Sequence, residues 1–369
     1  MFSLATLNTA EAMKTAEFDF DIKSRVMPHD PVELRGKPRD GGKMIVLDRS
    51  TKTIEHSVFS TICDYFRPGD LLVVNDSYML SNTLGFRCGE DAVQVTVQGH
   101  EPGNMTIVSV SAANKGLRIA AGTVLESEDA ESLTCTLAHQ HPDGLWSARF
   151  EPFELQTPTL DKYGRRLDET IHLNANFWKS RPDAYRCVYA KAPGSLEIPS
   201  AGLHFSDELL AEAAARGVEM AFVTLHVGAT ETFAVRHISA EDIENHKVRS
   251  EYYEVGEQAA AQINKARAEG RRVIAVGTTV MRTLETLTLN KAPGTPIEAR
   301  SGWTDLYIYP GFQFKAVDVL LTNLHRPRSS HIVLTASFAG TELTMKSYDE
   351  MGKMGGYEFD MFGDSMLIV

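Results

Sequence analysis

An imidazole between two large apolar side chains is the first feature of the sequence that could carry chemistry. In the segment PSAGLHFS, residues 199–206, His204 lies between Leu203 and Phe205, just before a helical pattern. Imidazole exchanges protons near neutral pH, so a histidine at a loop-to-helix junction is a candidate acid or base. The same placement also fits a hydrogen-bonded histidine of the core, because a single His beside apolar residues usually packs there.

Three further segments share the layout of an apolar strand that ends in a small, polar loop containing His or Gly. They are VTLHVGATETF (223–233), VIAVGTTVMRTLE (273–285) and LLTNLHRPRSS (320–330). In open α/β sheets, ligands bind outside the carboxyl ends of the strands, so we expect these loops to converge on one crevice. His226, in the first of them, joins His204 as a candidate catalytic residue.

The candidate binding residues lie in these loops and beside them. Gly277, Thr278 and Thr279 would offer backbone N–H groups to an anion or a nucleoside hydroxyl, although such turns also need glycine for steric reasons alone. Arg282, one turn into the following helix, could bind a carboxylate with two N–H groups or pair with Glu285. The other candidates for substrate binding are Asn75, Asp76, Pro199, Ser200, Gly228, His246, Glu251, Asn323, His325 and Ser329.

A metal site is not expected from the histidines and cysteines. His204, His226, His246 and His325 occur without the H-x-x-x-H or H-E-x-x-H spacing of helical metal sites. The four cysteines lie far apart with no C-x-x-C pair, which fits a reducing cytosol and argues against a disulfide framework or a thiolate zinc site.

The composition is that of a soluble globular protein. The chain has 369 residues, 43% hydrophobic and 23% charged, and is long enough for two domains. Its 37 Lys and Arg against 49 Asp and Glu give a net charge of −12, which disfavours sequence-independent nucleic-acid binding but not a local basic groove. With no signal peptide and no apolar run of membrane-spanning length, we expect a cytoplasmic protein without membrane association.

The pattern along the chain predicts an α/β domain interrupted by a small all-β module. KMIVLD (43–48) and DLLVVND (70–76) are predicted strands, and short strands with turn signals between them follow, typical of a small antiparallel barrel or sandwich. Further on, YRCVYA (185–190) and VEMAFVTLHV (218–227) are predicted strands, and helices are predicted at 206–217, capped by Ser206, and at 256–270. We therefore predict a discontinuous mixed α/β domain of residues 1–84 and 153–369, with the inserted domain at 85–152.

These segments, in their order, resemble the S-adenosylmethionine:tRNA ribosyltransferase-isomerase family of queuosine biosynthesis. The resemblance is carried in the C-terminal half by GSLEIPSAGLHFS, VTLHVG, HKVRSEYYEV, GRRVIAVGTTVMRTLE, YIYPGFQFKAVDVLLTNLHRPRSS, SFAG and FGDSMLI, and in the N-terminal half by FDFDI, PRDGGKMIVLDR and RPGDLLVVND. It covers nearly the whole chain. It implies an α/β domain with an inserted antiparallel β-barrel, in agreement with the organisation predicted from the pattern.

The resemblance also implies a reaction. The ribosyl portion of S-adenosylmethionine is transferred to a 7-aminomethyl-7-deazaguanine base in the tRNA anticodon and isomerised, giving epoxyqueuosine, while adenine and methionine leave. The sulfonium acidifies the C5′ protons and is itself a leaving group, so S-adenosylmethionine is a substrate and no tightly bound cofactor is implied. The protein must supply a base for a C5′ proton, an acid for adenine and a pocket that excludes water.

On this resemblance, each candidate residue has an expected role. His204 and His226 are the candidate acid and base, with His204 expected to face the donor pocket. Thr279 and Arg282, with the neighbouring Gly277 and Thr278, would hold the nucleoside or the methionine carboxylate. The opposite wall is expected to consist of Asn323, His325 and Ser329.

The chain also departs from the family pattern, which leaves two alternatives. Two arginines expected after RPGDLLVVND are Tyr78 and Thr83 here, and the second histidine expected after His246 is Arg249. Because polyanion binding rests on summed Lys and Arg contacts, the first alternative is a paralogue that keeps the donor but uses a smaller acceptor in a specialised biosynthetic pathway. The second is a non-catalytic homologue that binds a nucleoside or an RNA.

Overall fold

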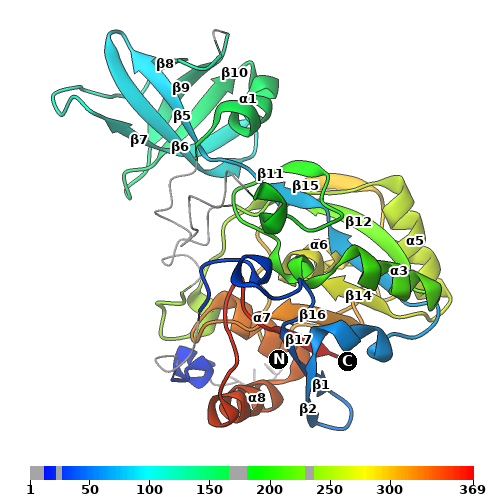
Figure 1. Cartoon of the computed structure of the whole chain (residues 1–369). Coiled ribbons are helices and arrows are strands. Elements are labelled where there is room, and N and C mark those ends of the chain that lie inside the picture. Colours follow the sequence, from blue (N-terminus) through cyan, green and yellow to red (C-terminus); the bar gives the residue numbers. More distant parts are fainter. Residues whose placement is uncertain (1–11, 22–26, 131, 166–180, 229–236) are drawn as a thin grey trace, which may run out of the picture.

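A nine-stranded mixed sheet forms the centre of the larger domain in the computed structural model of the chain (Figure 1). The structure describes residues 12–21, 27–130, 132–165, 181–228 and 237–369. The strands of the sheet, in spatial order, are β15 (Arg300–Thr304), β13 (Glu251–Val255), β12 (Glu219–Leu225), β3 (Leu71–Asn75), β14 (Val273–Val276), β16 (Val319–Asn323), β17 (Ser365–Ile368), β1 (Lys43–Asp48) and β2 (Thr53–Val58).

The four central strands are parallel and buried on both faces. β12 pairs with β3, β3 with β14 and β14 with β16, all in parallel. Along β3, Leu71 and Val73 enter one hydrophobic cluster and Leu72 and Val74 enter the other. This burial on both faces explains why the central strands are continuous apolar runs rather than alternating patterns.

Helices cover the two faces unequally. One face packs against α5 (Glu257–Ala268), α6 (Thr278–Thr288), α7 (Ser330–Ala339) and α8 (Thr341–Met354). The other packs against α3 (Asp207–Ala215) and the 3-10 helices η3 (Phe59–Tyr65) and η6 (Ser200–His204). Ser206 caps α3 as predicted, because its hydroxyl accepts a 3.2 Å hydrogen bond from the backbone N–H of Leu209.

The smaller domain is a closed antiparallel barrel at one end of the larger one (Figure 1). Its strands, in spatial order, are β10 (Trp146–Glu151), β7 (Met105–Ala112), β6 (Asp91–Glu101), β5 (Thr83–Cys88), β8 (Val124–Ser127) and β9 (Thr134–Gln140). Closure leaves no strand edge without a partner. The predicted fold class, a mixed α/β domain with an inserted antiparallel barrel, is confirmed, whereas the domain limits at 85 and 152 stay a prediction.

Other elements lie between and around the sheet and the barrel. A parallel pair, β4 (Ser77–Met79) and β11 (Ala192–Ser195), lies where the chain leaves the sheet for the barrel, and α1 (Gln156–Tyr163) follows the barrel. The other elements are the 3-10 helices η1 (Thr15–Phe18), η2 (Val32–Arg35), η4 (Phe153–Leu155), η5 (Pro182–Tyr185) and η8 (Ile243–Asn245). In the described part of the chain, no helix is both long and apolar enough to span a membrane.

One strand prediction is wrong. YRCVYA (185–190) does not form a strand: η5 ends at Tyr185, and a turn closed by the N–H of Ala190 on the carbonyl of Cys187 follows. The alternation that favoured a strand reflects burial, because Tyr185, Cys187 and Tyr189 are all buried. Alternating burial without a neighbouring strand to accept the backbone hydrogen bonds does not make a strand.

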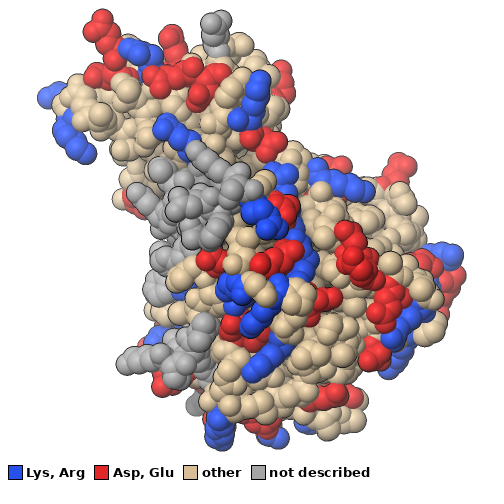
Figure 2. All heavy atoms as spheres, in the orientation of Figure 1, with Lys and Arg blue, Asp and Glu red and all other residues tan. Residues whose placement is uncertain are grey.

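On the face over the two domains seen in Figure 2, Lys and Arg side chains are intermixed with Asp and Glu. Basic side chains therefore occur locally on this face even though the whole chain carries a net charge of −12. Mixed charge of this kind limits the long-range attraction of a polyanion and leaves recognition to local contacts.

The loop before β16 is held by a buried carboxylate of α6. Glu285 Oε1 accepts hydrogen bonds from the backbone N–H groups of Lys315, Ala316 and Val317, at 3.0 to 3.2 Å. The side chain is fully buried, so these three donors have no water to replace the carboxylate. The alternative pairing of Arg282 with Glu285 is therefore not formed, because Glu285 binds this loop instead.

We expect Glu285→Ala to lower the free energy of unfolding by at least about 3 kcal/mol, because three buried N–H groups lose their acceptor. Glu285→Gln keeps an oxygen that can accept these bonds and should destabilise the protein less. Denaturant unfolding of each variant measures the difference. The matched control is Glu212→Ala, which removes the exposed pair of Glu212 with Arg216 at the end of α3 and should change stability by less than about 0.5 kcal/mol. Equal losses for Glu285→Ala and the control would contradict the assigned role.

Candidate active site

The ends of the four parallel strands bring the predicted polar loops together at one edge of the sheet. Asn75 ends β3, His226 follows β12, Gly277 follows β14 and Asn323 ends β16. Because these strands are neighbours and parallel, their carboxyl ends lie side by side. Residues 229–233 of the segment VTLHVGATETF lie outside the described residues.

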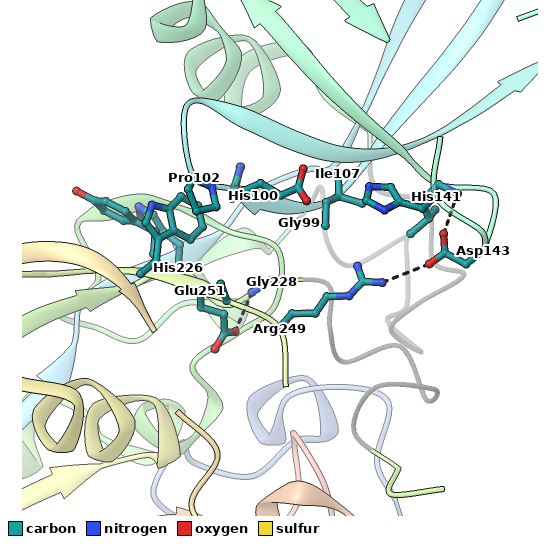
Figure 3. Close-up of a pocket in the computed structure, with 15 residues that line it drawn as sticks. Gly99, His100, Pro102, Ile107, His141, Asp143, His226, Gly228, Arg249 and Glu251 are labelled. Carbon is teal, nitrogen blue, oxygen red and sulfur yellow. Dashed lines mark hydrogen bonds and ion pairs between the residues drawn. The ribbon is translucent and has the colours of Figure 1, made fainter. Parts of the chain in front are cut away.

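Three adjoining cavities follow this edge. The interdomain cavity, about 280 Å³, lies between the barrel and the sheet and is lined by His226, Gly228, Arg249 and Glu251 among others (Figure 3). The Arg282 cavity and the Asn323 cavity, about 60 Å³ each, lie further along. Arg249 and Glu251 line both the first and the second cavity, and Thr278, Thr279 and His331 line both the second and the third. The cavities therefore adjoin one another along this edge, and together they are called the crevice below.

His226 is a buried, uncharged imidazole on the wall of the interdomain cavity. Burial is the main cause that lowers the pKa of His226 to about 4, and the neighbouring His100 lowers it further. The ring stacks on Tyr252 and packs against Gly194, where a Cβ atom would lie 2.5 Å from Cε1 of His226. Near neutral pH the ring is therefore a neutral base with a fixed orientation.

A chain of hydroxyl groups sets the tautomer of His226. Its Nδ1 lies 2.8 Å from Ser77 Oγ, which lies 2.6 Å from Ser195 Oγ. Ser195 Oγ accepts from the backbone N–H of Val227 and donates to the carbonyl of Leu225, so Ser77 can donate to Ser195 and accept from Nδ1–H. This assignment of the hydrogens leaves Nε2 as the unprotonated nitrogen.

His204 lies outside the crevice. Its ring packs on Phe59 with centroids 4.9 Å apart, and it lines a separate cavity of about 20 Å³ with Gly42 and Asp364. Its Nε2 is buried and has no hydrogen-bond partner among the residues that the structure describes. Burial lowers the pKa of His204 to about 4, with the charge of Arg39 as a second cause. The other end of η6 does reach the crevice, since Pro199 and Ser200 line the Asn323 cavity. His204 is thus packed behind the loop and does not line the crevice.

Arg282 and Glu251 form a buried ion pair in the wall between two cavities. The guanidinium of Arg282 bonds to Glu251 and also donates to the carbonyl of Leu306 at 2.9 Å. Glu251 accepts a second hydrogen bond, of 3.1 Å, from the backbone N–H of Gly228. The partner of Arg282 is therefore a carboxylate that neither predicted alternative included, and the pair fixes the backbone just after His226.

The first turn of α6 borders the Arg282 and Asn323 cavities. Gly277 precedes it with a φ of 94°, a conformation that disfavours side chains, and its N–H donates to the carbonyl of Leu321. Thr278 and Thr279 line both cavities. The positive end of the helix and these hydroxyl groups suit a ligand with anionic or hydroxyl oxygens.

Two buried polar atoms in the crevice have no partner within the described part of the chain. Asn323 Nδ2 donates to the carbonyls of Asp360 and Met361, which leaves Oδ1 of Asn323 buried and unsatisfied at the Asn323 cavity. The hydroxyl of Tyr307 is likewise unsatisfied at the Arg282 cavity. Unsatisfied buried polar atoms beside a cavity indicate hydrogen bonds that a ligand would complete.

Some predicted residues act on the backbone instead of lining the crevice. Asn75 bonds to both backbone groups of Leu225, Asp76 accepts from the hydroxyl of Thr224, and Ser329 caps α7.

The two other predicted histidines lie at or next to the cavities. His246 packs edge-on against Tyr307, which lines the Arg282 cavity. His325 does line the Asn323 cavity and bonds Thr322 at 2.9 Å.

The structure adds crevice residues that the sequence reasoning missed. His100, Glu101, His141, Asp143, Tyr252, Trp303, Tyr307 and His331 all line one of the three cavities. Trp303 belongs to the edge strand β15 and Tyr252 to its neighbour β13, and a half-buried aromatic residue on a polar strand was the available signal. Among the described residues, no group of three or more His, Cys, Asp or Glu could hold a metal ion.

The two positions that depart from the expected arginines lie near the barrel. Tyr78 lies under the guanidinium of Arg186, with 3.9 Å between the guanidinium carbon and the ring centroid, so a cation is still present there. Thr83 is buried in β5 and shares a 3.0 Å hydrogen bond with Thr96, where a charged arginine would have no room in the barrel wall.

Comparisons with known proteins show what the chain is similar to. A family model described as "Queuosine biosynthesis protein" matches residues 15–368. The chain is 39% identical to the S-adenosylmethionine:tRNA ribosyltransferase-isomerase of Moorella thermoacetica, over 97% of this chain and 100% of the relative, and 36% identical to that of Staphylococcus haemolyticus, with the same coverage. The crystal structure of the S-adenosylmethionine tRNA ribosyltransferase from Thermotoga maritima has a TM-score of 0.53 and 31% identity, over 96% of this chain and 100% of that chain.

The buried neutral His204 predicts a pH dependence of stability. Its folded pKa of about 4 lies below the unfolded value of 6.5, so the unfolded state binds more protons between these pH values and stability falls as the pH drops through this range. We expect His204→Gln to remove roughly 2 kcal/mol of the stability difference between pH 7 and pH 4.5. Asp364, whose pKa burial raises to about 6, acts in the opposite direction and remains in both proteins.

Denaturant unfolding at the two pH values measures this difference. His139→Gln, at an exposed histidine, is the matched control. If His204→Gln keeps the full acid sensitivity of the parent protein, His204 is not a buried neutral ring.

Proposed function

The chain belongs to the S-adenosylmethionine:tRNA ribosyltransferase-isomerase family of queuosine biosynthesis, and from this membership we propose how its crevice performs the reaction of that family. The enzyme uses S-adenosylmethionine as ribosyl donor and tRNA as acceptor. The ribosyl group goes to a 7-aminomethyl-7-deazaguanine base of the anticodon and is isomerised, with release of adenine and methionine. The reaction takes place in the cytoplasm, where tRNA is modified, and requires no tightly bound cofactor.

The observation that carries this proposal is the combination of a neutral imidazole with a long crevice at the carboxyl edge of the sheet. His226 lines the interdomain cavity, which shares lining residues with the Arg282 cavity, and the Arg282 cavity in turn shares lining residues with the Asn323 cavity. A donor with an adenine at one end and a methionine at the other needs an elongated site, and its C5′ carbon lies between the two ends. A crevice with a base in one wall meets both needs.

The donor lies along the first turn of α6. The adenine end fits the Asn323 cavity, where the unsatisfied Oδ1 of Asn323 can accept from an exocyclic amino group and where Pro199, Ser200 and His325 complete the wall. Thr278 and Thr279 bind the ribose hydroxyls or the methionine carboxylate. Arg282 contacts the donor in the Arg282 cavity, and its ion pair with Glu251 keeps the wall of that cavity in place.

His226 takes the C5′ proton. Its pKa of about 4 keeps Nε2 unprotonated near neutral pH, so the ring can accept a proton there. His204 contributes indirectly, because its packing anchors the segment that places Pro199 and Ser200 at the Asn323 cavity. The retained donor-side groups support an active enzyme over a non-catalytic homologue.

A turnover assay with mass-spectrometric detection tests the proposed function. S-adenosylmethionine is incubated with the enzyme and either tRNA carrying 7-aminomethyl-7-deazaguanine, or no acceptor. Release of adenine and methionine only with this tRNA, together with the mass gain on the nucleoside, is the expected result. Donor breakdown that depends on a small-molecule acceptor instead would indicate the paralogue, and binding of S-adenosylmethionine without turnover would indicate the non-catalytic homologue.

We expect His226→Asn to lower kcat by about 10²- to 10⁴-fold, because the variant lacks the nitrogen that accepts the proton. The amide of Asn can keep the hydrogen bond to Ser77, so the dissociation constant of S-adenosylmethionine, measured by titration calorimetry, should change by less than about threefold.

Gly194→Ala gives a second test, since its Cβ would displace the ring of His226 without removing it. This variant should also lose kcat while keeping donor affinity. Normal kcat in both variants would exclude His226 as the base.

A further inference from the structure

The wall of the interdomain cavity opposite His226 comes from the barrel. Gly99, His100 and Glu101 lie at the end of β6, and His141 and Asp143 lie in the β9–β10 turn (Figure 3). His100 makes a hydrogen bond to the backbone of Gly194 in β11, the glycine that also packs against His226. The cavity is therefore a built interface between the domains, and its volume of about 280 Å³ lies near the lower end of small-ligand sites.

The three carboxylates that line this cavity differ in how they are neutralised. Glu251 is paired with Arg282, and Asp143 lies 3.5 Å from Arg249. Glu101 has no Lys or Arg partner among the residues that the structure describes. A carboxylate of this kind on a cavity wall attracts a cationic group and repels an anionic one, so neither a phosphate nor the methionine carboxylate fits beside it.

A hydrogen-bonded chain holds Glu101 in place. Ser147 Oγ donates to Glu101 Oε2 at 2.7 Å and lies 2.8 Å from Nε2 of His141. Ser147 is buried in β10, so both neighbours are tied to a rigid strand of the barrel. One oxygen of Glu101 is thereby committed to the barrel, and the other remains available to a ligand.

The sheet side of the cavity is aromatic. Tyr252 stacks on His226, and Trp303 meets Tyr252 edge-on with ring centroids 5.8 Å apart. Both rings are half-buried, and both line the cavity. Aromatic faces of this kind bind planar bases that have been taken out of a nucleic-acid stack.

We propose that the interdomain cavity is the acceptor pocket, in which the aminomethyl-bearing base of the tRNA lies on Tyr252 and Trp303 and its cationic amine binds Glu101. This inference rests on the proposed function. It makes the barrel the part of the enzyme that selects the acceptor: Glu101 binds the amine, and Ser147 and His141 position Glu101. The base then lies directly beside His226 and next to the donor crevice.

The test compares two RNAs on the full-length enzyme. One is a tRNA carrying 7-aminomethyl-7-deazaguanine and the other is the same tRNA with guanine at that position, which lacks the amine. Equilibrium binding of both RNAs is measured together with kcat, KM for the modified tRNA and the dissociation constant of S-adenosylmethionine. The variants are Glu101→Gln, Glu101→Asp and His141→Asn, with thermal unfolding as a check of folding.

For Glu101→Gln we expect KM for the modified tRNA to rise at least about tenfold, because a charge-assisted hydrogen bond is lost. The preference of the enzyme for the modified tRNA over the guanine tRNA should disappear, and the dissociation constant of S-adenosylmethionine should stay within about twofold of the parent value. Glu101→Asp keeps the charge and should recover part of the preference. His141→Asn should weaken the preference without abolishing it. The matched control, Glu126→Gln, changes an exposed carboxylate on β8 of the same barrel and should leave all values unchanged.

Three outcomes would overturn the inference. A preference unchanged in Glu101→Gln would exclude Glu101 as the amine partner. A rise in the dissociation constant of S-adenosylmethionine with tRNA binding unchanged would place the cationic donor, and not the acceptor, in this cavity. Equal weakening of both RNAs would mean that Glu101 only supports the fold. If the parent enzyme modifies neither RNA, the proposed function itself fails, whatever the variants do.

Discussion

The side-chain amide of Asn75 is the interaction on which the geometry of the crevice depends. At the end of β3, its Oδ1 accepts from the N–H of Leu225 and its Nδ2 donates to the carbonyl of the same residue, at 3.0 and 2.9 Å. Nδ2 also reaches the hydroxyl of Thr279 at 3.5 Å. One buried amide thus joins the ends of β3 and β12 to the first turn of α6. It also fixes the backbone of Leu225, the residue just before His226. A polar group this deeply buried is stable because all its bonds are made to backbone and hydroxyl groups that need them.

Burial keeps both candidate histidines uncharged, but only His226 lines a cavity that a substrate could enter. Both have a pKa near 4, mainly because an imidazolium is poorly solvated in the protein interior. His226 combines this neutrality with a cavity and with a hydroxyl chain that sets its tautomer. His204 instead packs on the ring of Phe59 and lines a cavity of about 20 Å³, close to the size of one water molecule. A lowered pKa therefore marks a base only where a substrate can reach it.

The sequence predicts the sheet edge well and the opposite wall poorly. Apolar runs that end in polar loops are local patterns, so the convergence of His226, Gly277 and Asn323 could be read from them. The inward packing of His204 depends on Phe59, about 145 positions away in the chain, and no local pattern encodes it. The partner of Arg282 was missed for the same reason, because Arg282 lies on α6 and Glu251 on β13. Glu101 and His141 face the crevice only through the docking of the barrel, which antiparallel strand patterns do not specify.

The net charge of −12 gives the acceptor pocket particular importance. A strongly basic enzyme binds any tRNA tightly through its phosphates, and a base pocket then contributes little to discrimination. In an acidic protein that mixes both signs on the face seen in Figure 2, the sequence-independent part of the affinity is small. Contacts to a single base then make up a larger share of the total binding energy. A carboxylate such as Glu101, which would weaken phosphate binding, is compatible with tRNA recognition here because the proposed pocket brings it to the cationic amine of the acceptor and not to a phosphate.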